Sequence, residues 1–194
     1  MKKNSMELVF ILDKSGSMHG LEADTIGGFN SVIDEQKKLE GEVLVSTVLF
    51  SNSSETVHDR VSIKQIKKMT DSDYRTSGCT ALLDAVGGTI EHIEKIHKYI
   101  RSEDVPEKTM FVITTDGLEN ASKKYKGDQV RKMVEKKKEE GWEFIFLASN
   151  IDAAEAAVSI GIDAENAEQF ESTAAGSRKM FAKACCAISE IRAK

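Results

Sequence analysis

The sequence contains few of the residues that mark secreted, fibrous or membrane proteins. It has one proline and three cysteines in 194 residues, and two of the cysteines, Cys185 and Cys186, are neighbours. Because adjacent residues of a helix point in different directions, we do not expect a framework of structural disulfides. The basic start is followed by only a short apolar run, 8–12, so we predict no export signal. These absences favour the reducing cytoplasm.

The chain also lacks long apolar runs and a strong excess of one charge. No segment approaches the roughly 18 to 20 apolar residues that cross a bilayer. Lys and Arg number 27 and Asp and Glu 32, a net charge of −5, which leaves no broad basic field for a phosphate backbone. Since a domain commonly takes about 150 residues, we expect one domain over 1–194, with its core at about 7–191. We expect it to bind neither nucleic acid nor membrane.

Short apolar runs alternate with amphipathic segments along the chain. Runs rich in β-branched and aromatic residues predict buried strands at 8–12, 43–50, 109–114 and 144–148, a weak strand around 168–170, and an antiparallel edge strand at 56–61. Helical spacing predicts helices at 21–39, 62–69, 81–100, 129–140, 153–160 and about 177–191. The alternation predicts an α/β fold with a doubly wound, mostly parallel sheet and helices on both faces.

Polar residues stand where the predicted strands end. Asp13, Ser15 and Ser17 follow the first strand, Thr80 precedes the long helix, and Asp116 follows the strand at 109–114. Doubly wound sheets bind ligands beyond the carboxyl ends of their strands, where the strand order reverses. Two carboxylates and three hydroxyls form a hard oxygen donor set, which favours Mg²⁺, Mn²⁺ or Ca²⁺ over zinc or copper. The sequence therefore predicts a divalent metal site at this edge.

These segments resemble the metal-ion-dependent adhesion site, or MIDAS, of von Willebrand factor type A (vWA) domains. In that family the first strand ends in Asp-x-Ser-x-Ser, a threonine follows a glycine-containing loop before a helix, and Asp-Gly follows the next strand. Here they are 13–17, 77–82 and 113–117, and the resemblance spans about Glu7 to the final helix. It implies a bacterial-type vWA domain holding Mg²⁺ or Mn²⁺, ahead of Ca²⁺. The implied ligands, bound directly or through water, are Asp13, Ser15, Ser17, Thr80 and Asp116.

The resemblance also implies a function without catalysis. A partner protein would present an Asp or Glu carboxylate that completes the coordination of the ion. A change of Thr80 between direct and water-mediated ligation would couple the site to helix displacement. The alternative is a Mg²⁺-dependent phosphoester hydrolase with Asp13 as its nucleophile. Haloacid-dehalogenase-type phosphatases usually have a second Asp two positions later, where this chain has Ser15.

Ordinary structural roles compete with functional ones at several positions. Thr80 stands where a helix N-cap belongs, and Asp116 is a common turn former. Four loop residues either shape the rim of the site or serve as plain loop residues: Glu119, Asn120, Asn150 and Asp152.

Other polar and sulfur side chains favour structural roles. We expect His19 to be an exposed loop residue, and Cys79 a small buried one despite its place beside Thr80. We expect Cys185 and Cys186 to pack in the core and 136–138, three lysines, to form a solvated helix face.

Overall fold

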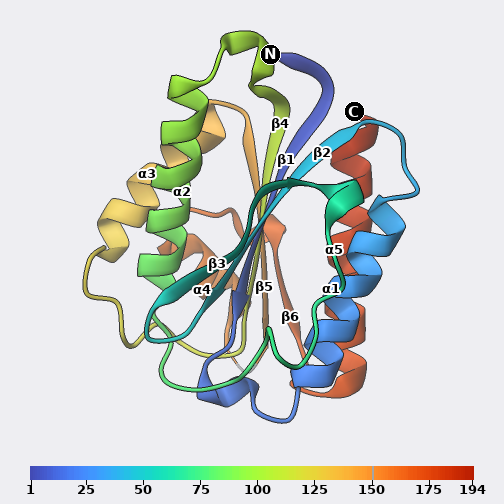
Figure 1. The fold of residues 1–194 in the computed structure, drawn as a ribbon. Helices are drawn as coiled ribbons and strands as arrows, with labels where there is room; N and C mark the ends of the chain where they lie inside the picture. Colours follow the sequence, from blue (N-terminus) through green and yellow to red (C-terminus); the bar gives the residue numbers. More distant parts are fainter. Residues whose placement is uncertain (150) are drawn as a thin grey trace.

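The structure is a computed structural model, and it describes residues 1–149 and 151–194 (Figure 1). Its strands are β1 (Lys2–Asp13), β2 (Glu42–Phe50), β3 (Ser54–Ser62), β4 (Pro106–Thr115), β5 (Trp142–Ser149) and β6 (Ala167–Phe170). Its α-helices are α1 (Glu22–Gln36), α2 (Leu82–Tyr99), α3 (Gly127–Glu139), α4 (Ala153–Ser159) and α5 (Ala174–Ala193). None of the described helices is long and apolar enough to span a bilayer.

In the described chain, the strands form one six-stranded sheet in the order β3-β2-β1-β4-β5-β6. β1 pairs in parallel with both β2 and β4, and the pairs β4–β5 and β5–β6 are parallel too. β3 pairs antiparallel with β2 at the edge. The predicted fold class is confirmed. The strand order reverses between β1 and β4, so the carboxyl ends of these two strands form the switch point where such sheets bind ligands.

Helices cover both faces of the sheet, with α1 and α5 on one face and α2 and α3 on the other (Figure 1). The central strand β1 contributes to both layers. Leu8, Phe10 and Leu12 pack in the cluster with α1 and α5, whereas Val9 and Ile11 pack in the cluster with α2, α3 and α4. This alternation explains why the first strand is a continuous apolar run, and it carries the chain directly to Asp13 at the carboxyl edge.

The predicted helix at 62–69 is wrong. β3 runs to Ser62, and only Ile63–Gln65 forms a short 3₁₀ turn. The Asn30 side chain of α1 accepts a hydrogen bond from Met69 N at 2.8 Å and donates one to Met69 O at 2.9 Å. The apolar spacing is real, since Ile63, Ile66 and Met69 are buried. However, Asn30 of α1 binds both peptide groups of Met69, and the backbone before it is helical only in the 3₁₀ turn.

Two further predictions about structural residues need correction. Lys137 is buried, with its Nζ 2.7 Å from Glu94 Oε1 and 2.6 Å from Glu140 Oε2, so 136–138 is not a uniformly solvated face. Its ammonium also lies 4.9 Å from the centre of the Trp142 ring. Of the adjacent cysteines, Cys185 packs partly against the core, but Cys186 is exposed.

Candidate functional site

Three loops bring the five predicted ligands to the carboxyl edge of the sheet. Asp13 ends β1, Ser15 and Ser17 lie in the turn after it, Thr80 stands just before α2, and Asp116 follows β4. Asp13 is fully buried, and Ser15, Thr80 and Asp116 are at most 3% exposed. Ser17 is exposed. The set therefore has a buried floor of carboxylates and hydroxyls and one hydroxyl on the solvent side.

Hydroxyl groups join the loop after β1 to the loop after β4. Ser15 Oγ and Ser17 Oγ lie 3.0 Å apart, and Ser17 Oγ donates to Asp116 Oδ1. Thr80 approaches from the third loop, because a Cβ atom at Gly117 would lie 3.1 Å from Thr80 Oγ1 and 3.4 Å from Ser17 Oγ. The glycine after Asp116 thus leaves room for two hydroxyls to approach the same stretch of backbone.

In the described part of the chain, the hydrogen bonds to Asp13 come from uncharged donors. Its Oδ1 accepts from Ser15 N at 2.7 Å and its Oδ2 accepts from Thr115 Oγ1 at 2.7 Å, while its carbonyl accepts from the Tyr74 hydroxyl. Burial raises the pKa of the Asp13 carboxyl, and the hydrogen bonds from Thr115 and Ser15 offset part of that rise. The neighbouring Lys14 does not serve as its counter-ion, because its Nζ pairs with Glu55 Oε2 at 2.5 Å.

The Asp116 side chain is likewise buried, and it accepts a hydrogen bond from the uncharged Ser17 hydroxyl. Burial raises the pKa of its carboxyl, the hydrogen bond from Ser17 lowers it, and the nearby Asp13 charge raises it again. Its Oδ2 is buried and has no hydrogen-bond partner among the residues that the structure describes. Two buried carboxylates with a free acceptor and neighbouring hydroxyls form a site whose ionised state calls for a cation. These oxygen donors fit a hard divalent metal ion.

Two loop residues that follow Asp116, for which the sequence left a rim role and a plain loop role open, position these ligands. Asn120 Oδ1 accepts from Thr80 N at 2.9 Å, and Asn120 N donates to Thr80 O at 3.0 Å. Glu119 accepts from Leu83 N at 2.8 Å and from Ser122 N at 2.7 Å. Both residues therefore anchor the Asp116 loop to the start of α2, the plain loop role that the sequence left open. An acid and an amide after Asp-Gly were the available signal.

Thr115 and Tyr74 were missed for different reasons. Thr115 lies beside Asp116 in the sequence, but a hydroxyl at a strand end gives no specific signal of a bond to Asp13. Tyr74 reaches the Asp13 carbonyl from a distant loop and is 1% exposed. No local pattern predicts a contact between residues so far apart in the chain.

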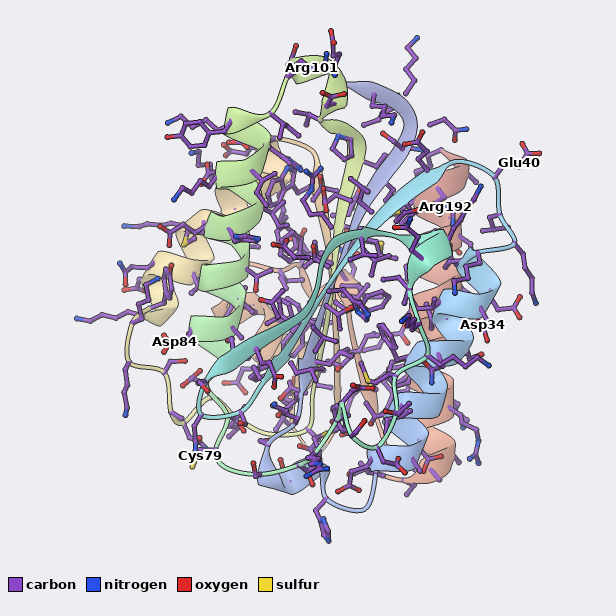
Figure 2. All side chains as sticks on the ribbon, viewed as in Figure 1. Asp34, Glu40, Cys79, Asp84, Arg101 and Arg192 are labelled. Carbon is purple, nitrogen blue, oxygen red and sulfur yellow. The ribbon has the colours of Figure 1, made fainter. Side chains whose placement is uncertain are left out.

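Several predictions about local roles can be compared with the structure. Thr80 is not an N-cap: that position belongs to Ala81, which makes no side-chain cap. Cys79 is exposed rather than buried (Figure 2). His19 is exposed as predicted, with Nδ1 3.1 Å from Glu22 Oε1.

Asp152 and Asn150 are the other two residues that the sequence offered for the rim. Asp152 caps α4 by accepting from Glu155 N at 2.9 Å. Asn150 lies outside the described residues. Across 1–149 and 151–194, there is no group of three or more His, Cys, Asp or Glu side chains that would hold a metal. Any ion here would depend on hydroxyl ligands.

Comparison with known proteins identifies the fold. No family model and no curated protein matches the sequence. A structure of proximal thread matrix protein 1 from the mussel byssus, with a zinc-occupied MIDAS motif, superposes with a TM-score of 0.61 at 14% identity. The ArnB paralog VWA2 from Sulfolobus acidocaldarius gives 0.55 at 20% identity. The chain has a vWA-like fold.

A third structural match extends the comparison to a pilus protein. The pilus adhesin SpaC from Lactobacillus rhamnosus GG, in an open conformation, gives a TM-score of 0.70 at 12% identity. The matches cover 94%, 84% and 97% of this chain, in the order given, but only 46%, 40% and 30% of those chains. The chain thus spans less than half the length of each. At such identities, the likeness extends to the fold alone.

Proposed function

We propose that this chain is a metal-dependent protein-binding module. Mg²⁺ or Mn²⁺ at the carboxyl edge of the sheet would accept an Asp or Glu carboxylate from a partner protein. The observation that carries the proposal is the buried pair Asp13 and Asp116, which within 1–149 and 151–194 has uncharged donors alone and one oxygen without a partner. A bound cation would balance these charges and would serve as an electrophilic docking point for an outside oxygen ligand.

The donors suit different parts of that task. Asp13 and Asp116 would supply the charge, and Ser15, Ser17 and Thr80 would supply neutral oxygens. Because Ser17 is exposed, a partner's carboxylate can approach the ion from its side. The mussel protein, whose MIDAS motif holds zinc, supports a divalent cation here. The all-oxygen donor set favours Mg²⁺ or Mn²⁺, ahead of Ca²⁺.

We further propose that the module is not an enzyme. A nucleophilic Asp13 would need an accessible oxygen, yet this side chain is fully buried and both of its oxygens accept hydrogen bonds. Ser15 also replaces the second acid of the hydrolase pattern. Turnover of a generic phosphoester with Mg²⁺, abolished in Asp13→Asn, would favour the hydrolase instead.

The cellular setting is part of the proposal. Three free cysteines favour a reducing compartment, and we propose the cytoplasm, with a protein partner rather than nucleic acid or membrane. The similarity to a pilus adhesin supports a different location. Fractionation of source cells, followed by detection of the protein in the cytoplasmic and surface fractions, distinguishes the two.

The direct test is a pull-down from source-cell lysate. Wild type in Mg²⁺, wild type in EDTA, and Ser15→Ala in Mg²⁺ are compared, with Ser72→Ala as an exposed-hydroxyl control from the 70–74 loop. We expect a partner that binds wild type and Ser72→Ala only with Mg²⁺ and is lost from Ser15→Ala. Binding that is equal in Mg²⁺ and EDTA would contradict the proposal.

A further inference from the structure

Leu118 is an exposed apolar side chain beside the candidate site. It is 65% exposed and follows Asp116 and Gly117 directly. Gly117 is the backbone position that the hydroxyls of Thr80 and Ser17 approach. Leu118 therefore stands at the rim of the proposed metal site, one residue beyond the closest approach of three loops.

The loop that carries Leu118 is fixed on both sides of it. Asp116 accepts from Ser17 Oγ on one side, and on the other the Glu119 carboxylate accepts three backbone N–H groups, those of Leu83, Ala121 and Ser122. Asn120 binds the peptide groups of Thr80 in both directions. The residues around Leu118 thus hydrogen-bond to the backbone of the loop and of the start of α2, while the leucine side chain is exposed on a braced backbone.

The place of Leu118 distinguishes it from the other exposed apolar side chains. In the part of the chain that the structure describes, the others are Met1, Leu39, Tyr99 and Val158. Met1 is the first residue of the sequence, Leu39 follows α1, Tyr99 is the last residue of α2, and Val158 lies in α4. A single exposed leucine is ordinary on a protein surface. One held rigidly beside two buried carboxylates is placed to touch whatever approaches them.

We propose that Leu118 selects the partner, by packing against an apolar side chain that neighbours the partner's acidic residue. This inference rests on the proposed metal-dependent function. A metal ion attracts every carboxylate alike, so it supplies affinity without discrimination between acidic segments. The leucine adds an apolar contact that only some segments satisfy, and its fixed loop lowers the entropy cost of that contact. Cys79, next to Thr80 in the sequence, is another exposed uncharged side chain (Figure 2).

The test uses an array of acetylated octapeptides with a central Asp and randomised neighbours, probed in Mg²⁺ and in EDTA. Leu118→Ser is compared with wild type and with Leu39→Ser, a matched exposed leucine after α1. We expect the Mg²⁺-dependent binders of wild type to be enriched in bulky apolar residues next to the Asp. Leu118→Ser should bind them about tenfold more weakly, and Leu39→Ser should bind like wild type. Calorimetry should give all three proteins the same Mg²⁺ affinity.

The outcomes separate this inference from the proposed function. Mg²⁺-dependent binders without an apolar neighbour, or binders that Leu118→Ser retains at full strength, would overturn the role of Leu118 and leave the module's function standing. A loss of Mg²⁺ affinity in Leu118→Ser would also overturn it, because the leucine would then act through the metal site. If Mg²⁺ binds but no acidic peptide binds with it, the proposed function itself is wrong.

Discussion

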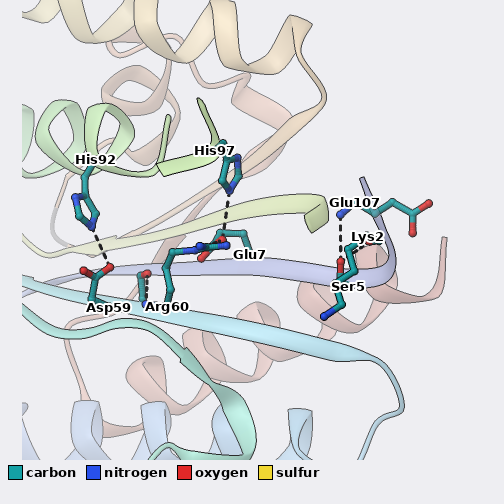
Figure 3. A network of polar contacts seen from close by, with 9 residues as sticks. Lys2, Ser5, Glu7, Asp59, Arg60, His92, His97 and Glu107 are labelled. Carbon is teal, nitrogen blue, oxygen red and sulfur yellow. Dashed lines mark hydrogen bonds and ion pairs between the residues drawn. The ribbon is translucent and has the colours of Figure 1, made fainter. Parts of the chain in front are cut away.

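Two carboxylates of β1 are both fully buried, yet the groups around them differ in charge. Glu7, toward the start of the strand, accepts from Arg60 Nε at 2.8 Å, and its Oε2 lies 3.3 Å from His97 Nε2 (Figure 3). At the end of the strand, the hydrogen bonds that the Asp13 side chain accepts from the described residues come from uncharged groups, among them Ser15 N and Thr115 Oγ1. Burying a carboxylate is costly unless a positive charge accompanies it. Glu7 has that charge within the fold, and we propose that a bound cation supplies it to Asp13.

The contrast distinguishes a buried carboxylate that pairs with a cation of the fold from one that lies beside a second carboxylate. Around Glu7, Arg60 of β3 and His97 of α2 meet over the sheet, and His92 of α2 also pairs with Asp59 of β3 at 2.9 Å (Figure 3). These contacts tie the helix to the edge hairpin. Around Asp13 the second carboxylate is Asp116, which adds charge of the same sign. Two carboxylates buried side by side would destabilise a closed core, but they suit a site that binds a cation.

The largest expected effect comes from removing the cation that accompanies Glu7. Arg60→Ala should lower the free energy of unfolding by about 3 kcal/mol, because it leaves a buried carboxylate without its partner. Urea unfolding measures the change, and Arg101→Ala, an exposed arginine, is the matched control. The double variant Arg60→Ala with Glu7→Gln should recover part of the loss. Full stability in Arg60→Ala alone would remove the distinction between the two carboxylates.

The next effect concerns the cation that Asp13 lacks. Mg²⁺ at about 100 times its dissociation constant should stabilise wild type by about 2.7 kcal/mol, and Asp13→Asn should lose this gain. Without metal, Asp13→Asn should be at least as stable as wild type, because an amide is less costly to bury than an uncompensated carboxylate. Thermal unfolding with and without Mg²⁺ measures both, and Asp59→Asn, on an exposed acid, is the control. Mg²⁺ stabilisation that survives in Asp13→Asn would show that the ligands are wrong.

A smaller effect should appear in the pH dependence of the metal-free protein. The pKa of Asp116 is raised above its ordinary value of 3.8 in the fold, so its contribution to stability is full below that value. It is lost as the pH rises through the raised pKa. In EDTA, wild type should therefore lose stability relative to Asp116→Asn as the pH increases above about 4. Urea unfolding of both proteins across this range measures the difference, and the opposite slope would contradict the assignment.

Added Mg²⁺ should reverse that trend in wild type. The metal binds the ionised carboxylates, so its stabilising effect should grow as the pH rises through the same range. Asp116→Asn should show a weaker Mg²⁺ effect with less dependence on pH. A gain from Mg²⁺ that is equal at all pH values would indicate binding away from Asp13 and Asp116.

Local sequence patterns predicted the architecture well where burial dictates them. Strands buried on both faces must be continuously apolar, so the run before Asp13 was unmistakable. The helix prediction for 62–69 failed because its spacing reflects burial of Ile63, Ile66 and Met69, while Asn30 of α1 binds the peptide groups at the end of the segment. Spacing alone reports which side chains are buried and cannot report which partner the backbone finds.

For the site too, features local in the sequence could be predicted, whereas contacts between distant residues could not. The order of its three polar segments was readable, and the structure brings them to one edge; their role as metal ligands stays a prediction. The contacts that support the site could not be predicted, because Tyr74 and the candidate loop residue Asn120 bond to residues far from them in the sequence. The solvated face predicted for 136–138 was wrong for the same reason, since the burial of Lys137 depends on Glu94 and Trp142 in other elements.

The smallest expected effect sharpens the comparison most directly. Lys14 is the cation nearest to Asp13 in the sequence, but its Nζ pairs with Glu55 on β3. An ion pair with an exposed partner is worth at most about 1 kcal/mol, so Lys14→Met should change the free energy of unfolding far less than Arg60→Ala. Its Mg²⁺ affinity, measured by calorimetry, should match that of wild type. A loss as large as that of Arg60→Ala would mean that Lys14 neutralises Asp13 after all, and the case for an external cation would then fail.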